Sequence, residues 1–155
     1  MKNGKIYLDN CCYNRPYDDQ SEPRVYLESQ AKMLIQDLIK QKRFELTTST
    51  VLDYEISKSP YGDRRNAILQ FTQENSNRHI NVNESPDILK YANIIMETGV
   101  KFYDAYHVAC AIYGGCDFFI STDKRLLEYQ SSKIRIVNPI DFIIEMENEY
   151  EHNQD

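Results

Sequence analysis

Two acidic residues lie at positions where the parallel sheet of an α/β protein would bring their carboxylates together. Asp9 ends the short apolar run at 6–8, and Asp123 follows an expected strand at 117–120 by three residues. Because open parallel sheets bind ligands outside the carboxyl ends of their strands, both side chains are expected at one edge of the sheet. An Asp in such a place often caps the next helix, so capping alone explains Asp123 equally well.

Asp104 and Glu55 are the other acidic candidates. Asp104 lies in the first turn of an expected helix, 102–113, that is otherwise almost wholly apolar. A carboxylate there is costly to bury unless the helix N-terminus or a metal ion compensates its charge. Glu55 follows the helix-capping pair Ser49 and Thr50, and it is the weakest candidate because exposed Glu residues are common on helices.

If these four carboxylates lie close together in the fold, they predict a binding site for a hard metal ion. Several carboxylates in one crevice cannot all stay ionised without cations, and oxygen ligands select Mg²⁺ or Mn²⁺. Two such ions about 3.5–4 Å apart stabilise the attacking and leaving oxygens of a phosphodiester displacement, without a histidine base. The three His residues show no zinc-site spacing. The chain also has no glycine-rich motif for cradling nucleotides.

Candidate substrate contacts are basic or aromatic. His107 lies one turn from Asp104 and could touch a substrate. A neutral His packed in the core is the alternative, favoured by about two to one. The 12 Tyr residues suit stacking on single-stranded RNA, with half-buried core edges as the alternative. The candidate phosphate contacts, for which solvated surface charge is the alternative, are Arg15, Lys58, Arg64, Arg65 and Lys101.

The elements expected to position these residues alternate between strand and helix. Apolar runs predict strands at 6–8, 44–48, 79–82, 117–120 and 134–137. Helical patterns lie at 22–43, 50–56, around 67–71, 86–98, 102–113, 124–129 and 139–144. In the first of these, Leu27, Ala31, Leu34 and Leu38 share one row, with Ile35 and Ile39 beside it. The polar residues 10–21 predict a loop. This alternation predicts a parallel sheet covered by helices on both faces.

Composition indicates one folded domain, 1–145, followed by an acidic tail, 146–155. Most of the net charge of −6 comes from the last eleven residues, which hold five acids and no Lys or Arg. The rest of the chain is close to neutral, so charge neither supports nor excludes a nucleic-acid partner. The N-terminus has no signal-peptide pattern, and no apolar run reaches the roughly 18 residues of a membrane span. We therefore expect a cytoplasmic protein with no membrane contact, whose four Cys residues are reduced and mostly buried.

Together the motifs resemble the PIN-domain family over roughly residues 4–145. The resemblance rests on IYLDN with Asp9, TSTVLDYEIS with Glu55, DAYHVACA with Asp104, and STD with Asp123. It implies a three-layer α/β/α sandwich with a five-stranded parallel sheet. It also implies a Mg²⁺- or Mn²⁺-dependent endoribonuclease like the VapC-type toxin of a toxin–antitoxin pair, with RNA as substrate, an antitoxin as partner and a homodimer as a common assembly.

Carried over by position, the four acids form the metal cluster, and Asn10 and Thr122 support it by hydrogen bonds. Two other classes of protein remain to be weighed. A non-catalytic PIN-like domain that binds RNA or a protein is disfavoured because all four acids are present. A receiver domain is disfavoured because it needs a Lys after its late strand, whereas Lys133 precedes the strand expected at 134–137.

Overall fold

Five short strands form one parallel sheet in the computed structural model, which describes residues 4–154. The strand order is β3-β2-β1-β4-β5, and every neighbouring pair is parallel. The strands are β1 (Lys5–Leu8), β2 (Glu45–Ser49), β3 (Ser76–Ile80), β4 (Phe118–Ile120) and β5 (Arg135–Val137). The order reverses at β1, which lies between β2 and β4, so the ends of these three strands are neighbours.

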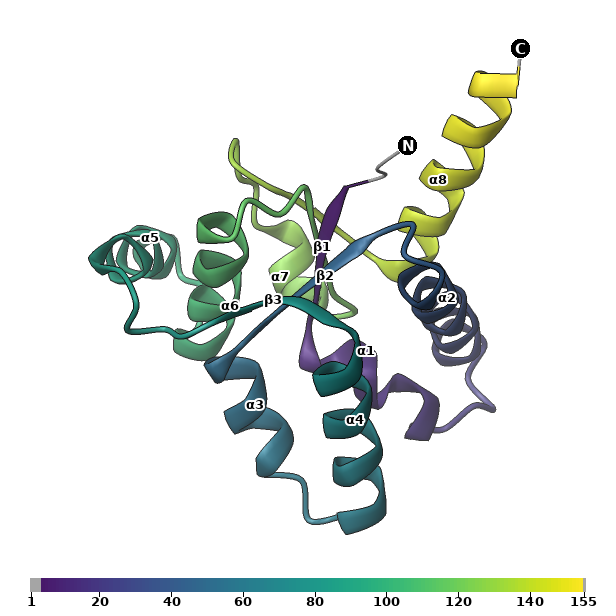
Figure 1. Cartoon of the computed structure of the whole chain (residues 1–155), viewed down its shortest axis with the longest axis horizontal. Helices are drawn as coiled ribbons and strands as arrows, with labels where there is room; N and C mark the ends of the chain where they lie inside the picture. Colours follow the sequence, from purple (N-terminus) through teal and green to yellow (C-terminus); the bar gives the residue numbers. More distant parts are fainter. Residues whose placement is uncertain (1–3, 155) are drawn as a thin grey trace.

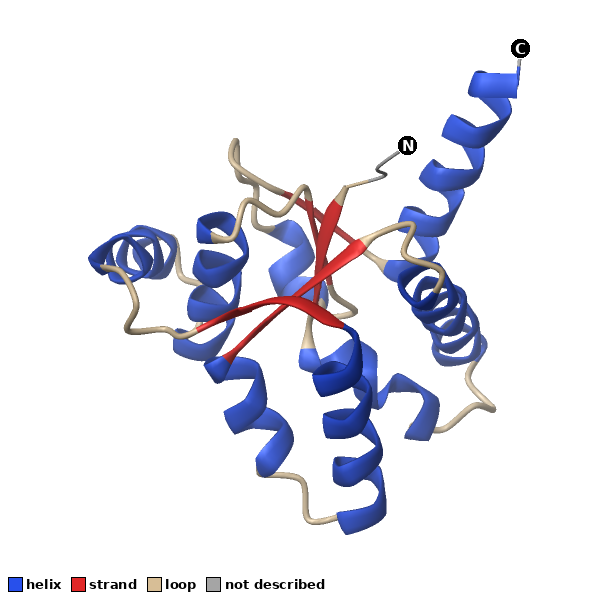
Figure 2. Cartoon of the chain, in the orientation of Figure 1, coloured by secondary structure: helices blue, strands red, loops and turns tan. Residues whose placement is uncertain are grey.

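Helices cover both faces of this sheet, which confirms the predicted α/β/α sandwich (Figures 1 and 2). The helices are α1 (Asn10–Asn14), η1 (Arg15–Tyr17), α2 (Pro23–Lys40), α3 (Thr50–Ser57), α4 (Gly62–Asn75), α5 (Pro86–Glu97), α6 (Phe102–Tyr113), α7 (Lys124–Glu128) and α8 (Pro139–Gln154). One core packs α5, α6 and α7 on Tyr7 and Phe119. The other packs α1 to α4 and α8 on Ile6, Leu8 and Leu46.

The helix starts follow the local signals in the sequence. Ser49 caps α3, because its hydroxyl accepts a hydrogen bond from the Leu52 N–H. Ser85 caps α5 in the same way, and Pro86 occupies the first helical position, where its missing N–H costs nothing. Helix α6 covers the predicted range 102–113 and is mostly buried, as its apolar composition requires.

Two expectations about the elements before β2 are wrong. Residues 10–21 are not a loop throughout, because Asp9 caps the short helix α1 and the 3₁₀ turn η1 follows it. In α2, Leu27 and Leu34 are about half exposed, at 53% and 51%. The core side of that helix carries the expected Ala31, Ile35 and Ile39 and, in addition, the buried acid Glu28. A pattern of leucines alone could not reveal that a charged residue faces inward.

The strand β3 lies earlier than the predicted range 79–82. Its residues are mostly exposed and polar, so no apolar alternation marks them. The pairing with β2 is irregular between Leu46 and Thr47, where the Asn77 side chain accepts a hydrogen bond from the Leu46 N–H. Tertiary pairing at the edge of the sheet, rather than local sequence, therefore decides the position of β3.

The C-terminal acidic segment is helical as far as Gln154, because α8 continues through it. Its first residue, Met146, packs against the core. All four Cys residues are free thiols, and three of them are buried, as predicted. Among the described residues, no helix is both long and apolar enough to cross a membrane.

Glu28 joins three helical segments from inside the protein. Its carboxylate is fully buried and accepts hydrogen bonds from Arg15 at 2.7 and 2.9 Å. Arg24, on the same helix, donates at 3.1 Å, and the Asn138 amide next to α8 also donates to it. A buried charge is tolerated only when its hydrogen bonds are satisfied in this way, so Arg15 stabilises the fold rather than facing a substrate.

We predict that Arg15→Ala lowers the free energy of unfolding by about 3 kcal/mol, because it removes the main partner of a buried carboxylate. Arg24→Ala is the matched control: Arg24 is 41% exposed, so its loss should cost less than about 1 kcal/mol. Urea unfolding of both variants measures the difference. Wild-type stability in Arg15→Ala would contradict this role.

Candidate metal centre

Asp9 lies at the carboxyl end of β1 with its carboxylate held on two sides. One oxygen, Oδ1, accepts the Asn10 backbone N–H at 2.8 Å, and the other accepts the Ser121 hydroxyl at 2.9 Å. Cys11 Sγ is a third neighbour at 3.4 Å. These contacts orient a carboxylate that is only 5% exposed, and Ser121 joins it to the end of the neighbouring strand β4.

Glu55 reaches the same place from α3. Its carboxylate contacts Nε2 of His107, which is fully buried on α6. One ligand atom from each of Asp9, Glu55 and His107 lies within 4.8 Å of the other two. Side chains from three different elements therefore meet within the span of a single coordination sphere.

The electrostatics of Asp104 show that it shares this acidic region. Burial, together with the charges of Asp9, Asp123 and Glu55, raises the pKa of its carboxyl to about 6, against the opposing effect of His107. Asp104 is in the first turn of α6, where the helix dipole alone would favour a charged acid. The pKa is nevertheless raised, so desolvation and the nearby acids outweigh the dipole.

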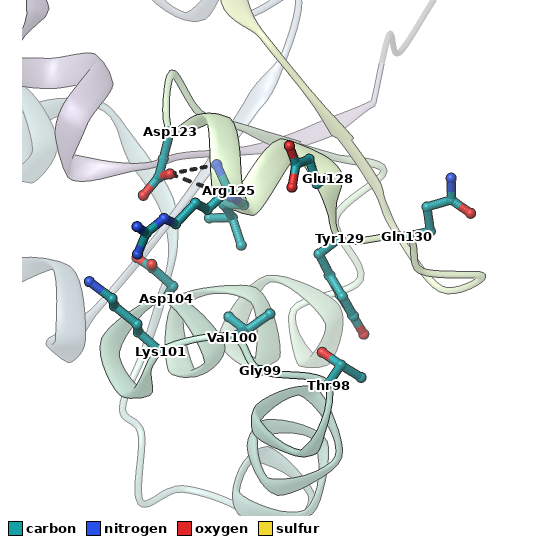
Figure 3. A pocket seen from close by; sticks show the side chains of 11 residues that line it. Thr98, Gly99, Val100, Lys101, Asp104, Asp123, Arg125, Glu128, Tyr129 and Gln130 are labelled. Carbon is teal, nitrogen blue, oxygen red and sulfur yellow. Dashed lines mark hydrogen bonds between the residues drawn. The ribbon is translucent and has the colours of Figure 1, made fainter.

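Asp123 combines the two roles that its sequence position left open. Its Oδ1 caps α7 by accepting the N–H groups of Arg125 and Leu126 at 2.9 and 3.5 Å. The residue also lines a cavity of about 620 Å³ together with Asp104 (Figure 3). Lys101 and Arg125 line this cavity as well, so cations stand beside the acids. The proximity of Arg125 was missed because nothing in the sequence pattern marks it.

The structure thus brings the four predicted acids to one edge of the sheet. Of the two residues expected to support them, Asn10 contacts Asp9 through its backbone, and Ser121 takes the place expected of Thr122. The Asn10 side chain bonds to Asn14, and only its backbone N–H contacts Asp9. The backbone N–H of Thr122 donates to Cys11, whereas the hydroxyl that contacts Asp9 belongs to Ser121.

Two of the expected substrate contacts, His107 and Lys58, lie in contrasting environments, one buried and one exposed. Burial lowers the pKa of His107, but its bond to Glu55 and the nearby acids raise it more, and the net shift is upward. With no exposed surface, His107 does not face a substrate. Lys58 Nζ lies over the rings of Tyr54 and Tyr103, 4.3 and 4.8 Å from their centres, at the exposed ends of α3 and α6.

The donor set fits a hard divalent cation. Carboxylate oxygens are the ligands preferred by Mg²⁺ and Mn²⁺, and the raised pKa of Asp104 reports negative charge that a cation would neutralise. Asp9, Glu55, Asp104 and Asp123 are the residues that would hold it. A ring nitrogen of His107 lies in the same cluster as the carboxylate oxygens of Asp9 and Glu55.

A carboxylate crevice at the carboxyl edge of a five-stranded parallel sheet, enclosed by helices, defines an α/β protein with a candidate metal site. The chain belongs to the PIN-domain family, whose sequence model matches residues 6–131. No curated protein matches the sequence.

Two solved structures are similar in fold. A chain of VapBC2 from Rickettsia felis, determined with a DNA fragment from its promoter, is 14% identical with a TM-score of 0.55, covering 86% of this chain and 98% of that chain. PAE2754 from Pyrobaculum aerophilum is 13% identical with a TM-score of 0.50, covering 93% of this chain and 95% of that chain. Identities this low support the fold and carry no functional detail.

We predict that Asp104→Asn stabilises the metal-free protein at pH 7.5. The pKa of Asp104 in the folded protein is about 6, above the ordinary value of 3.8, so the stability linked to this group is present at low pH and lost as the pH rises through about 6. After discounting for solvent screening, we expect a gain of about 1 kcal/mol, or roughly 2–4 °C in Tm.

Thermal unfolding in EDTA at pH 4 and pH 7.5 tests this, because the gain should shrink at the lower pH. The matched control is Asp87→Asn, an exposed acid in the first turn of α5, which should bring no gain. A clear fall in Tm for Asp104→Asn at pH 7.5 would show that the carboxylate is structural.

Proposed function

We propose that this protein is a metal-dependent endoribonuclease that hydrolyses phosphodiester bonds of RNA, using Mg²⁺ or Mn²⁺ held by Asp9, Glu55, Asp104 and Asp123. The single observation that carries the proposal is the convergence of these acids at one edge of the sheet, where burial and the charges of the other three raise the pKa of Asp104 to about 6. A fold has no structural need for four acids in one place, and their mutual repulsion costs stability. PIN domains are generally nucleases, which agrees with this reading.

The residues around the acids suit a phosphodiester substrate. A bound divalent ion would polarise the phosphate of the substrate and activate a water molecule. Asp9 is held rigidly by Asn10 and Ser121, so its carboxylate keeps one orientation. Lys101 and Arg125 line the cavity beside Asp104 and Asp123, where they can attract the backbone phosphates of a nucleic acid.

Exposed aromatic side chains support a single-stranded substrate. A second cavity of about 550 Å³ is lined by Tyr54, Phe102, Tyr103 and Tyr106, with the amides of Asn81 and Asn83 nearby. Tyr54 and Tyr103 directly precede the site acids Glu55 and Asp104 in the chain. Unpaired bases stack on aromatic rings, and Lys58 beside them supplies positive charge, so this surface suits RNA next to the acidic crevice.

The biological setting that we propose is that of a toxin restrained by an antitoxin protein. This rests on the fold shared with a chain of the VapBC2 complex of Rickettsia felis. Free, mostly buried thiols agree with a reducing cytoplasm. A non-catalytic RNA-binding role has less support, because such a protein would not need the crowded acids.

We predict that Asp9→Asn reduces RNA cleavage at least about 100-fold, because it removes a charged metal ligand while Asn still caps α1. Cleavage of a fluorogenic single-stranded RNA with Mg²⁺ or Mn²⁺ measures this. The matched control is Asp37→Asn, an exposed acid on α2, which should cleave like the wild type. Cleavage that persists in excess EDTA, or equally in Asp9→Asn, would refute the proposed chemistry.

A further inference from the structure

Four polar side chains form a continuous hydrogen-bonded chain through the interior. The Tyr7 hydroxyl lies 2.6 Å from Ser49 Oγ and 2.6 Å from His107 Nδ1. The other ring nitrogen of His107 contacts the Glu55 carboxylate. Ser49, Tyr7 and His107 have no exposed surface, whereas the Glu55 side chain is 26% exposed. The buried chain therefore ends at a candidate metal ligand that faces the crevice.

The protons of this chain can be placed from its chemistry. Burial holds the pKa of the Tyr7 phenol well above its usual range, so it keeps its one proton. With a neutral imidazole, Ser49 donates to Tyr7, Tyr7 donates to Nδ1, and Nε2–H donates to Glu55. With an imidazolium, the first two bonds reverse and Nε2–H still donates to Glu55. His107 therefore donates its Nε2 hydrogen to Glu55 in both protonation states of the ring.

The same chain connects the elements that carry three of the site acids. Tyr7 lies on β1, two residues before Asp9, and Ser49 caps the helix that carries Glu55. His107 lies one turn beyond Asp104 on α6. The two links at Tyr7 are buried, and the link to Glu55 is part-buried. Breaking a buried link leaves a polar atom without a partner, at a cost that opposes relative movement of the three elements.

Packing alone does not account for these residues. Tyr13 is a fully buried tyrosine whose hydroxyl has no hydrogen-bond partner among the described residues, so a phenol can serve as an apolar ring in this core. Tyr7 differs because its hydroxyl bonds to two neighbours. Helix α6 is otherwise apolar on its buried side, and an aliphatic residue in place of His107 would fill the space without needing partners.

We infer that Tyr7, His107 and Ser49 are positioning residues of the metal centre, which hold the Glu55 carboxylate toward Asp9 through a hydrogen-bonded chain rooted in the cap of α3. This rests on the proposed function, because it assumes that Glu55 binds a cation. Partners behind a metal ligand fix its orientation, and their loss typically weakens metal affinity about 10- to 100-fold. None of the three residues need touch the ion or the RNA.

The matched pair of variants is Tyr7→Phe and Tyr13→Phe. Each removes one buried hydroxyl and keeps the ring, but only the Tyr7 hydroxyl belongs to the chain. We expect Tyr7→Phe to weaken binding of Mn²⁺ alone about 10-fold or more, and Tyr13→Phe to leave it unchanged. Isothermal titration of the RNA-free protein with MnCl₂ at 20 °C gives the Kd, and thermal unfolding shows that both variants are folded.

Two substitutions of His107 separate positioning from general stability. Gln at this position can still donate an N–H to Glu55, so His107→Gln should bind Mn²⁺ more tightly than His107→Leu, whichever of the two is the more stable. Pulsed electron paramagnetic resonance on the wild-type protein with Mn²⁺ should show no directly coordinated ¹⁴N. A strong ¹⁴N coupling would overturn the inference by making His107 itself a ligand.

Different results would overturn the metal-dependent function and the positioning role. A wild-type protein that binds no Mn²⁺ overturns the proposed function and, with it, the positioning role. A wild-type protein that binds Mn²⁺, with the same Kd in Tyr7→Phe and His107→Leu, overturns the positioning role and leaves the proposed function standing.

Discussion

Repulsion between carboxylates at one edge of the sheet is the constraint around which this protein is organised. Like charges that are partly removed from water raise one another's pKa, and Asp104 shows the effect. Three of the acids follow the ends of β2, β1 and β4, which are adjacent because the strand order reverses at β1. Such a reversal is where open parallel sheets place their ligands. The fold thus creates the crowding that a cation would relieve.

A concentration of charge of this kind requires a rigid frame. The crevice is bordered by the hydrogen-bonded chain from Ser49 through Tyr7 to His107, which links β1, α3 and α6. On the other face of the sheet, buried Glu28 ties η1 and α2 to the start of α8. In both places a buried polar group is satisfied by partners that are distant in sequence. The frame therefore depends on the complete fold.

How far prediction from sequence succeeded depended on whether the signal was local. The start of α5 at Pro86 and the whole range of α6 were predicted correctly, because a Ser-Pro cap and an unbroken apolar helix are local patterns. The helix α1 was missed, since five residues rich in Asn and Cys have no helical periodicity. Strand β3 was misplaced because it forms by pairing with β2 rather than through an apolar pattern of its own.

The sequence by itself determined the class of fold and singled out four candidate acids, because strand ends and helical periods can be recognised from residue type and spacing. Only the tertiary structure decided what surrounds each acid. It showed that Ser121 rather than Thr122 contacts Asp9, that Arg15 bonds to buried Glu28, and that His107 lies behind Glu55. These partners lie between 13 and 112 residues apart along the chain. No local pattern can encode such contacts, because they form only when packing brings separate elements within hydrogen-bond distance.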